Sequence, residues 1–595
     1  MEPQEQTDTT VFEPLTKALT QAFVQNLNET LQNLPSALPA AFSALGLGAR
    51  EKKGEKGAGL PPITWEMPKI EFDAERMKAL CDDYVKECRQ LWQSGVNAAV
   101  LGRDKRFAAP AWSENQWSTF AVAVYQLNAR TLEGMVEAAH ADSKTRARLH
   151  FFADQWKAAA APSNFLAFNA EAQRRVVETR GASIAQGVRN LFQDVRRGHL
   201  SMTDESLFEV GRNVATTEGA VVFENALFQL IEYKPLTATV FDRPFLIVPP
   251  CINKFYILDL QPSDSFIRYA VEQGQHVFVI SWRNPEEADE ELRQATWDDY
   301  IENAAIRAIH AVQEITGSEQ INVLGFCVGG TILTTALAVL AARGEQPAAS
   351  LTLLTTLLDF AHTGVLDLFV DEPSVRLREL QMGRGGLMAG IDLSTTFSFL
   401  RPDDLVWNYV VANYLKGETP PAFDLLYWNC DSTNLPGPFY AWYLRYTYLE
   451  NKLRQPSELT VCGEKINLGA IKAPVYIYGS REDHIVPIDS AYASTRILRG
   501  KKRFVMGASG HIAGVINPPA KHKRSYWLRE DGKIPKSHAE WAAGATEHPG
   551  SWWPDWSAWL GTHGGKQIPA PRRYGRGTRY RSIEPAPGRY VKTRI

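Results

Sequence analysis

Short hydrophobic runs alternate with helix-forming segments through most of the chain after residue 215. The runs have the length and composition of buried strands, and they lie at 245–248, 277–280, 321–324, 351–354, 475–478 and 504–506. Helical segments lie between several of them, at 263–273, 297–315 and 331–343. Strands and helices that alternate in this way predict a mostly parallel sheet covered on both faces, which is an α/β fold.

The region before this alternation has a different, helical pattern. Within 63–214, for example, Leu80, Tyr84 and Cys88 are spaced four apart, as on one face of a helix. Cys81 and Cys88 lie on the same predicted helix and are interpreted as small core residues. No acid–base or ligand cluster stands out here, so we predict a helical N-terminal domain over 63–214.

Residues 1–62 are expected to form a mobile arm and linker. Apolar residues recur at steps of four and three, which predicts an amphipathic helix ended by Pro35; they are Leu15, Leu19, Phe23, Leu27, Leu31 and Leu34. The charged, glycine-rich stretch 50–59 is typical of a flexible linker. The apolar stripe either packs on the rest of the protein or binds a hydrophobic surface or partner.

One interval interrupts the alternation within the α/β domain, which we place at 215–595. Between Asp359 and Val475 the chain is rich in aromatic and turn residues. An insertion of this length at the carboxyl end of a sheet is expected to lie over the strand ends as a lid, at about 361–468. An ordinary extra subdomain is the alternative.

Composition narrows the class of protein. With 595 residues, 45% of them hydrophobic and 22% charged, the chain is expected to hold two or three globular domains. A net charge of -3 supplies no general attraction for nucleic acid. The six cysteines form no Cys-x-x-Cys pair, which favours a reducing compartment. An acidic, polar beginning and the lack of a long apolar run predict a cytoplasmic protein with no transmembrane segment.

The strand at 321–324 runs into Gly325-Phe326-Cys327-Val328-Gly329-Gly330 and then into a helical segment. This pattern is typical of a nucleophile elbow, here with cysteine in place of serine. Its glycines let strand and helix approach closely, so that the nucleophile is exposed on a strained turn. The positive end of the helix favours the thiolate of Cys327. We therefore predict an α/β-hydrolase fold with Cys327 as nucleophile.

A thiol nucleophile needs a base, and the base needs a carboxylate that orients it. In this fold the acid and then the histidine follow later strands. Asp483 follows the strand at 475–478 and is predicted as the acid, and His511 follows the strand at 504–506 and is predicted as the base. His484 as a secondary base and Glu482 as the acid remain alternatives.

Two backbone N–H groups are needed to stabilise the oxyanion that forms on attack. Val328, directly after the nucleophile, is one predicted donor. The other is expected in the loop after the strand at 245–248, where Ile252 or a neighbouring residue is the candidate. Cys251 in the same loop is interpreted as a packed thiol and not as a second nucleophile.

Cysteine suits acyl transfer from a thioester, because exchange between two thiols of similar pKa is close to thermoneutral. Onward transfer from a cysteinyl thioester to an alcohol is then downhill. The elbow thus fits an enzyme that takes acyl groups from coenzyme A and delivers them to hydroxyls. Thiol hydrolases use the same arrangement, and spacing alone leaves both open.

Several long motifs resemble those of the class I polyhydroxyalkanoate synthases, which polymerise (R)-3-hydroxyacyl-CoA. The resemblance covers the chain from about Trp65 onward and is strongest in the elbow and in 248–254, 259–262, 281–285, 478–487, 510–519 and 550–556. It implies that Cys327 carries the growing acyl chain and that His511 deprotonates it. It also implies that Asp483 assists the 3-hydroxyl of the incoming monomer, alone or through His511.

The resemblance further implies short-chain monomers, chiefly 3-hydroxybutyryl, a homodimer, and attachment to the polyester granule and possibly to granule-associated proteins. The chain shows no phosphate-binding glycine loop and no metal-ligand set, so coenzyme A is expected as part of the substrate, with no cofactor and no metal. Residues 521–524 are basic and are either a site for its phosphates or a solvated surface. Trp552, Trp553, Trp556 and Trp559 are interpreted as core or interface packing.

Two other classes of function remain as alternatives. A thioesterase or polyester hydrolase of the α/β-hydrolase fold would use the same three residues and release a soluble acid. A granule-coat or scaffold protein would show no turnover and would keep its function in Cys327→Ala.

Overall fold

The computed structural model describes residues 70–102 and 104–594. The chain folds into two compact units. The helical unit comprises the described residues up to Met202 together with Thr395–Pro421, and the sheet unit comprises Thr203–Ser394 and the described residues from Ala422 onward. The arm and linker predicted at 1–62 lie outside the described residues. Residues 395–421, which the sequence places inside a lid at 361–468, group with the N-terminal helices; the predicted domain boundaries stay a prediction.

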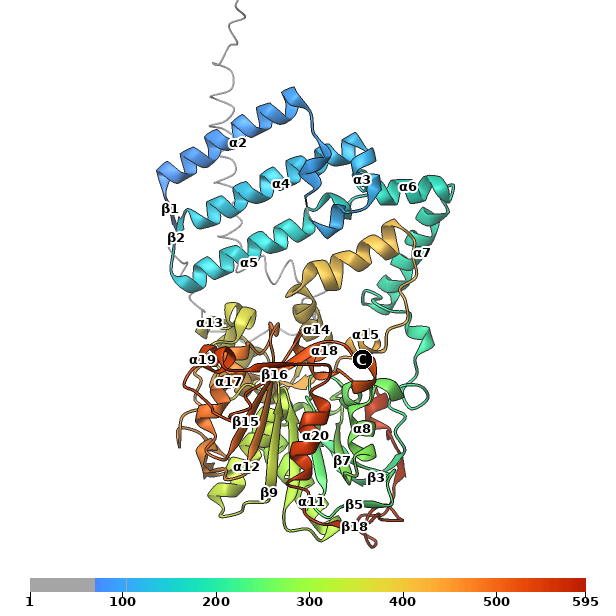
Figure 1. Ribbon diagram of the computed structural model, residues 1–595, viewed down its shortest axis with the longest axis vertical. Coiled ribbons are helices and arrows are strands. Elements are labelled where there is room, and N and C mark those ends of the chain that lie inside the picture. The colour runs from blue at the N-terminus through green and yellow to red at the C-terminus, as the bar shows by residue number, and fades with distance from the viewer. Residues whose placement is uncertain (1–69, 103, 595) are drawn as a thin grey trace, which may run out of the picture. The chain divides into compact units, whose positions relative to one another are not determined.

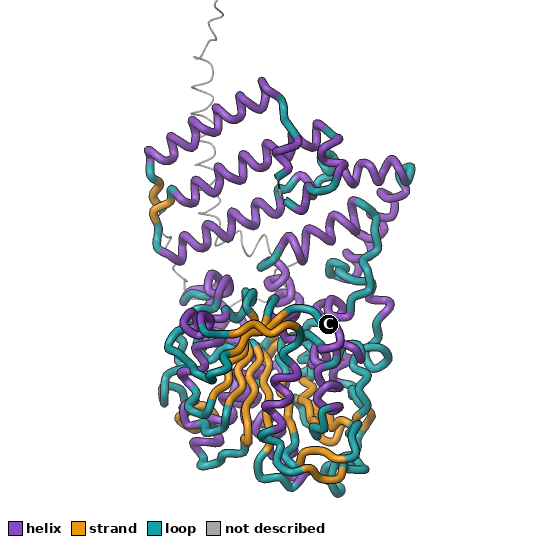
Figure 2. The backbone as a smooth tube through the Cα atoms, in the orientation of Figure 1, coloured by secondary structure: helices purple, strands orange, loops and turns teal. Residues whose placement is uncertain are grey.

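The sheet unit is built on an 11-stranded mixed sheet (Figures 1 and 2), with the strand order β17-β16-β15-β14-β9-β8-β6-β7-β4-β3-β19. Its six central strands pair in parallel. They are β7 (Val277–Trp282), β6 (Phe245–Val248), β8 (Ile321–Phe326), β9 (Ala348–Leu354), β14 (Val475–Ser480) and β15 (Lys502–Gly507). These are the six strands that the hydrophobic runs predict, and the α/β fold class is confirmed.

Antiparallel strands extend the sheet at both edges. On the side of β7 they are β4 (Phe228–Tyr233), β3 (Gly219–Glu224) and β19 (Glu584–Pro585). On the side of β15 they are β16 (Ser525–Leu528) and β17 (Thr546–Pro549). The sequence did not predict these edge strands, which draw the last part of the chain back onto the sheet.

Both faces of the sheet are covered. Phe245 and Ile247 of β6 point into a core that also contains α8 (Phe266–Glu272) and α20 (Trp553–Gly561). The four tryptophans belong to this core: Trp552, Trp553 and Trp556 are at most 1% exposed, and Trp559 packs against them. Residues that alternate with these point to the opposite face, where α11 (Arg307–Thr316) and α12 (Val328–Ala342) pack.

The helical unit contains α2 (Ala74–Ser94), α4 (Gln116–Glu137), α5 (Ser143–Ala159), α6 (Ala170–Glu178) and α7 (Ala182–Arg197), as Figure 1 shows. Its helical character agrees with the pattern of the sequence. Aspartate side chains start two of these helices, because Asp73 and Asp142 each accept hydrogen bonds from two backbone N–H groups of the first turn.

Helix α7 has two unlike faces. One face packs on the helical turn η10 (Val410–Leu415) of the same unit, where Asn190 donates to the Asn413 carbonyl and Tyr414 donates to Asp194. The other face carries an exposed apolar stripe, which consists of Ile184, Val188, Leu191, Phe192 and Val195. Contiguous apolar side chains exposed to water are uncommon on protein surfaces and often mark interaction sites.

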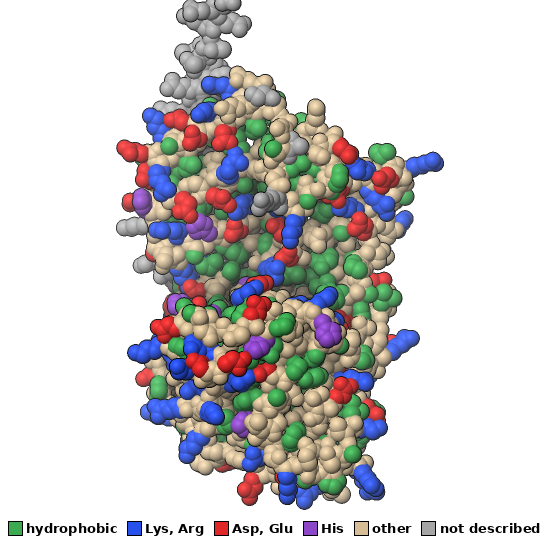
Figure 3. All heavy atoms as spheres, viewed as in Figure 1, with side chains coloured by type: hydrophobic (Ala, Val, Ile, Leu, Met, Phe, Trp, Pro, Cys, Tyr) green, Lys and Arg blue, Asp and Glu red, His purple; other side chains and the backbone are tan. Residues whose placement is uncertain are grey.

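Basic and acidic side chains are interspersed on the face shown in Figure 3. This mixture agrees with the net charge of -3 and gives no field of a single sign. Within residues 70–102 and 104–594, every helix is too short or too polar to cross a bilayer.

Candidate active site

The turn between β8 and α12 has the geometry of the predicted elbow. Cys327 has φ 52° and ψ -129°, a region that residues with a side chain rarely adopt. The turn is held from both sides, since the Cys327 N–H donates to the Leu354 carbonyl and its own carbonyl accepts from Gly330, each at 2.9 Å. The thiol is thereby presented at the N-terminus of a helix.

The elbow glycines are required by close backbone approach. A Cβ on Gly325 would lie 2.3 Å from the Cα of Gly330. A Cβ on Gly329 would lie 2.3 Å from the Val248 oxygen and 2.4 Å from the Pro249 oxygen. Larger residues would push α12 away from β8 and β6. The first turn of α12 therefore packs directly on the loop that follows β6.

Asp483 and His511 are brought together from two neighbouring parallel strands. Asp483 follows β14, and His511 follows β15 as the first residue of α18 (His511–Val515). The His511 Nδ1 lies 2.6 Å from the Asp483 Oδ2. The Asp483 Oδ1 accepts from the N–H groups of Ile485 and Val486, each at 2.8 Å. Both carboxylate oxygens are thus engaged, and the imidazole is fixed in one orientation.

The thiol of Cys327 also hydrogen-bonds to His511, which brings all three predicted residues into one cluster. Burial lowers the pKa of His511, but the charges of Asp483 and Cys327 and the hydrogen bonds to both outweigh it and raise the pKa to about 10. The ring of Phe326 stacks on the imidazole with its centroid 5.9 Å away. This environment favours an imidazolium beside the sulfur.

The alternatives for acid and base fit the geometry less well. The side chain of Glu482 is 60% exposed and pairs with Arg481 at 3.2 Å. His484 is partly buried next to Asp483 in sequence, but the imidazole that contacts both Asp483 and Cys327 is that of His511.

The predicted oxyanion donors come from two separate segments. Val328 is the first residue of α12, and Ile252 lies in the loop after β6. That loop is anchored by Trp282, whose Nε1 donates to the Pro249 oxygen at 2.9 Å. Burial, with a smaller contribution from the charge of Cys327, raises the pKa of the Cys251 thiol. Cys251 thus stays protonated, as expected of a packed thiol.

Aromatic residues that the sequence did not assign to the site also lie near Cys327. Burial and, to a lesser degree, the charge of Cys327 raise the pKa of Tyr443 and Tyr448. Their rings pack edge to face at 5.4 Å, and Tyr443 stacks on Trp297 at 5.5 Å. Both tyrosines come from the expected lid region, through α16 (Gly437–Tyr443) and η11 (Leu444–Leu449). The sequence around Tyr443 and Tyr448 is rich in aromatic residues but gives no sign that these two lie near Cys327. Their position is seen only in the structure.

The basic residues 521–524 are all exposed. Two of their four side chains have partners within the sheet unit: Lys521 pairs with Asp264, and Arg524 donates to backbone carbonyls. The structure thus gives no specific support for a phosphate site there.

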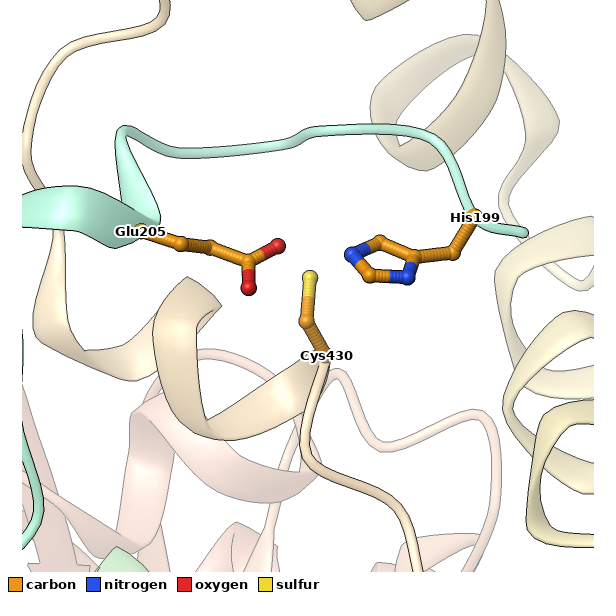
Figure 4. Close-up of side chains that lie close together, drawn as sticks. All are labelled: His199, Glu205 and Cys430. Carbon is orange, nitrogen blue, oxygen red and sulfur yellow. The ribbon is translucent and has the colours of Figure 1, made fainter. Parts of the chain in front are cut away.

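Figure 4 shows another thiol of the sheet unit. Cys430 follows α15 (Asp424–Asn429), and its sulfur lies within 4.8 Å of a carboxylate oxygen of Glu205. His199, also drawn there, belongs to the helical unit. Cys430 has ordinary helical backbone angles, φ -79° and ψ -8°, so it lacks the strained turn that presents Cys327.

The sheet order and the elbow define a protein of the α/β-hydrolase fold. A family model for that fold matches residues 244–518, and a model for the N-terminus of poly-beta-hydroxybutyrate polymerase (PhaC) matches residues 103–270. The chain is 61% identical over 520 residues to the poly(3-hydroxyalkanoate) polymerase subunit PhaC of Cupriavidus necator, which covers 86% of this chain and 87% of that protein.

Two further relatives have similar names. A poly(3-hydroxyalkanoate) polymerase of Methylorubrum extorquens is 42% identical over 82% of this chain and 80% of its own length. The PhaC subunit of Rhizobium meliloti is 41% identical over 84% and 81%. The chain belongs to the poly(3-hydroxyalkanoate) polymerase family.

Proposed function

We propose that this protein polymerises (R)-3-hydroxyacyl-CoA into polyhydroxyalkanoate and releases coenzyme A, through a thioester on Cys327. The observation that carries the proposal is the Asp483–His511 contact of 2.6 Å, with Cys327 hydrogen-bonded to the same imidazole. Membership of the family supports the choice of substrate.

In the first step the Cys327 sulfur attacks the carbonyl carbon of the acyl-CoA thioester. His511 already holds the thiol proton as an imidazolium, and the N–H groups of Val328 and Ile252 donate to the oxyanion. When the tetrahedral intermediate collapses, the bond to the coenzyme A sulfur breaks, and His511 returns the proton to that sulfur. The acyl group then resides on Cys327, and the exchange of one thioester for another is close to thermoneutral.

In the second step the 3-hydroxyl of another hydroxyacyl unit attacks the Cys327 thioester. His511 accepts the hydroxyl proton, an ester bond forms, and the Cys327 sulfur leaves. Conversion of a thioester to an oxyester is downhill and drives the chain forward. Tyr443, which is buried, and Tyr448, which is partly buried, both sense the charge of Cys327 and help to keep water from the thioester.

We assign Asp483 the role of orienting His511 and stabilising its imidazolium. One Asp483 oxygen accepts from two backbone N–H groups and the other contacts the imidazole, so the carboxylate reaches the substrate hydroxyl through His511. The family resemblance implies that Asp483 assists the 3-hydroxyl of the monomer, alone or through His511. These contacts favour assistance through His511.

The finer features rest on the resemblance. We propose a class I enzyme that acts chiefly on 3-hydroxybutyryl-CoA, works as a homodimer and attaches to the polyester granule. Each step above uses only protein groups and the substrate, so we propose no resident cofactor or metal.

Product analysis tests the function. The purified protein is given 3-hydroxybutyryl-CoA, and free thiol, soluble 3-hydroxybutyrate and insoluble polyester are measured together. We expect free coenzyme A in step with insoluble polyester. Soluble 3-hydroxybutyrate as the only acyl product would instead establish a thioesterase.

A further inference from the structure

Lys254 is a buried basic residue in the loop that carries the predicted donor Ile252. Its residue is 3% exposed, and its Nζ donates to the backbone carbonyl of Thr593. Burial lowers the pKa of Lys254. A buried ammonium group costs free energy unless it gains strong partners. We therefore asked what this contact does, since it joins the loop to a segment more than three hundred residues later in the chain.

The same loop is fixed from a second side by α15 and the segment that follows it. The Trp428 Nε1 donates to the Lys254 carbonyl at 2.7 Å, and the Thr433 N–H donates to the Ile252 carbonyl at 3.0 Å. Asn253 forms an antiparallel bridge with Ser432. Three successive residues of the loop are therefore held by their backbone.

Arg594 and Asp431 join these two supports. Asp431 accepts from the Tyr256 hydroxyl at 2.9 Å through Oδ2, and its Oδ1 lies 3.8 Å from Arg594. The Arg594 guanidinium lies over the ring of Tyr427, 4.7 Å from its centroid. The loop is thus enclosed by two segments that also contact each other.

We propose that Lys254 is a positioning residue that holds the Ile252 N–H where the oxyanion forms, and that Arg594 anchors the final segment, which bears the Thr593 carbonyl, to Asp431. The inference rests on the proposed function, because it assumes acyl transfer at Cys327. Lys254 acts on the reaction through the backbone of the loop and touches no reacting atom.

Two reactions of the same thiol separate this role from general stability. Attack of Cys327 on a thioester creates an oxyanion, which needs its donors in place. Alkylation of Cys327 by iodoacetamide displaces iodide and creates no oxyanion. A misplaced donor therefore slows the first reaction and not the second, whereas a loosened elbow or a lost His511 contact changes both.

The test compares Lys254→Met, Lys254→Arg and the control Lys592→Met, whose side chain is exposed in the same final segment. Coenzyme A release from 3-hydroxybutyryl-CoA is measured in single turnover, and alkylation of the Cys327 peptide is followed by mass spectrometry. For Lys254→Met we expect release to fall about tenfold or more, with alkylation within about twofold of wild type. Lys254→Arg keeps a donor and is expected to recover part of the loss.

Unchanged release in Lys254→Met, or equal slowing of release and alkylation, would overturn the proposal. If Lys254→Met does not fold, Arg594→Gln carries the same comparison, with release reduced about threefold and alkylation unchanged. Equal rates in Arg594→Gln and wild type would then refute it. Product identity in the wild type tests the proposed function separately, since hydrolysis and polymerisation both pass through the oxyanion.

Discussion

Helices α12 and α7 have 15 and 16 residues and contrasting surroundings. In α12 of the sheet unit, every residue from 328 to 340 is buried. In α7 of the helical unit, the apolar stripe from Ile184 to Val195 is exposed. The sheet unit uses its apolar side chains to fix the backbone behind Cys327, while the helical unit turns a comparable set outward. A tightly packed backbone behind the thiol and an exposed apolar face are therefore separate properties of the two units.

The sharpest test of this division is a pair of cysteine substitutions. Cys327→Ala is expected to lower coenzyme A release by about 10⁴-fold or more, because it removes the nucleophile. Cys88→Ala, on α2 of the helical unit, is expected to change release by less than about twofold. Release is measured with 3-hydroxybutyryl-CoA, and circular dichroism checks the fold. Activity above about 1% in Cys327→Ala would contradict the assignment of the nucleophile.

A pair of buried aspartates sharpens the contrast. Asp483→Asn is expected to reduce turnover about 10²-fold or more, because an amide cannot stabilise the imidazolium of His511. Asp194→Asn is expected to cost about 1–3 kcal/mol of stability instead, because Asp194 accepts from Ser201 and Tyr414 within the helical unit. Turnover and thermal midpoint are measured for both variants. The comparison fails if the two variants lose activity to the same extent.

A matched pair of leucines tests the two helices directly. Leu333 in α12 is fully buried, and Leu191 in α7 is 43% exposed. Leu333→Ala is expected to lower the free energy of unfolding by about 2–5 kcal/mol, and Leu191→Ala by less than about 0.5 kcal/mol. Denaturant unfolding followed by tryptophan fluorescence measures both. Similar losses would show that the α7 stripe is part of a core.

The last test concerns the pH dependence of stability. The pKa of His511 is raised from 6.5 to about 10, so its contribution to stability is fully present below pH 6.5 and is lost as the pH rises through about 10. The difference in thermal midpoint between wild type and His511→Gln is therefore expected to shrink from pH 6.5 toward pH 10. Exposed His522 provides the control as His522→Gln. A difference that grows with pH would contradict the sign.

Sequence pattern was sufficient for the central sheet and for the approach of Asp483 to His511. Fully buried parallel strands are continuous apolar runs, and the carboxyl ends of neighbouring parallel strands meet at one edge. Placing Asp483 after β14 and His511 after β15 therefore brings them together without knowledge of side-chain contacts.

Sequence pattern could not predict the contacts between segments that are distant along the chain. The edge strand β19 pairs with β3, and Lys254 reaches Thr593, although nothing in either sequence segment identifies the other. The grouping of residues 395–421 with the helical unit has the same cause. Periodicity reports which face of an element is buried, whereas the partner that buries it depends on the tertiary fold.

The backbone of Cys327 has a consequence for the evolution of the enzyme. Its positive φ favours glycine over any residue with a side chain, so the proposed nucleophile occupies a place where the backbone would be less strained with glycine. Selection for heat resistance alone would favour glycine at this position, and the activity would be lost. A laboratory screen for robust variants must therefore demand polymer formation in every round.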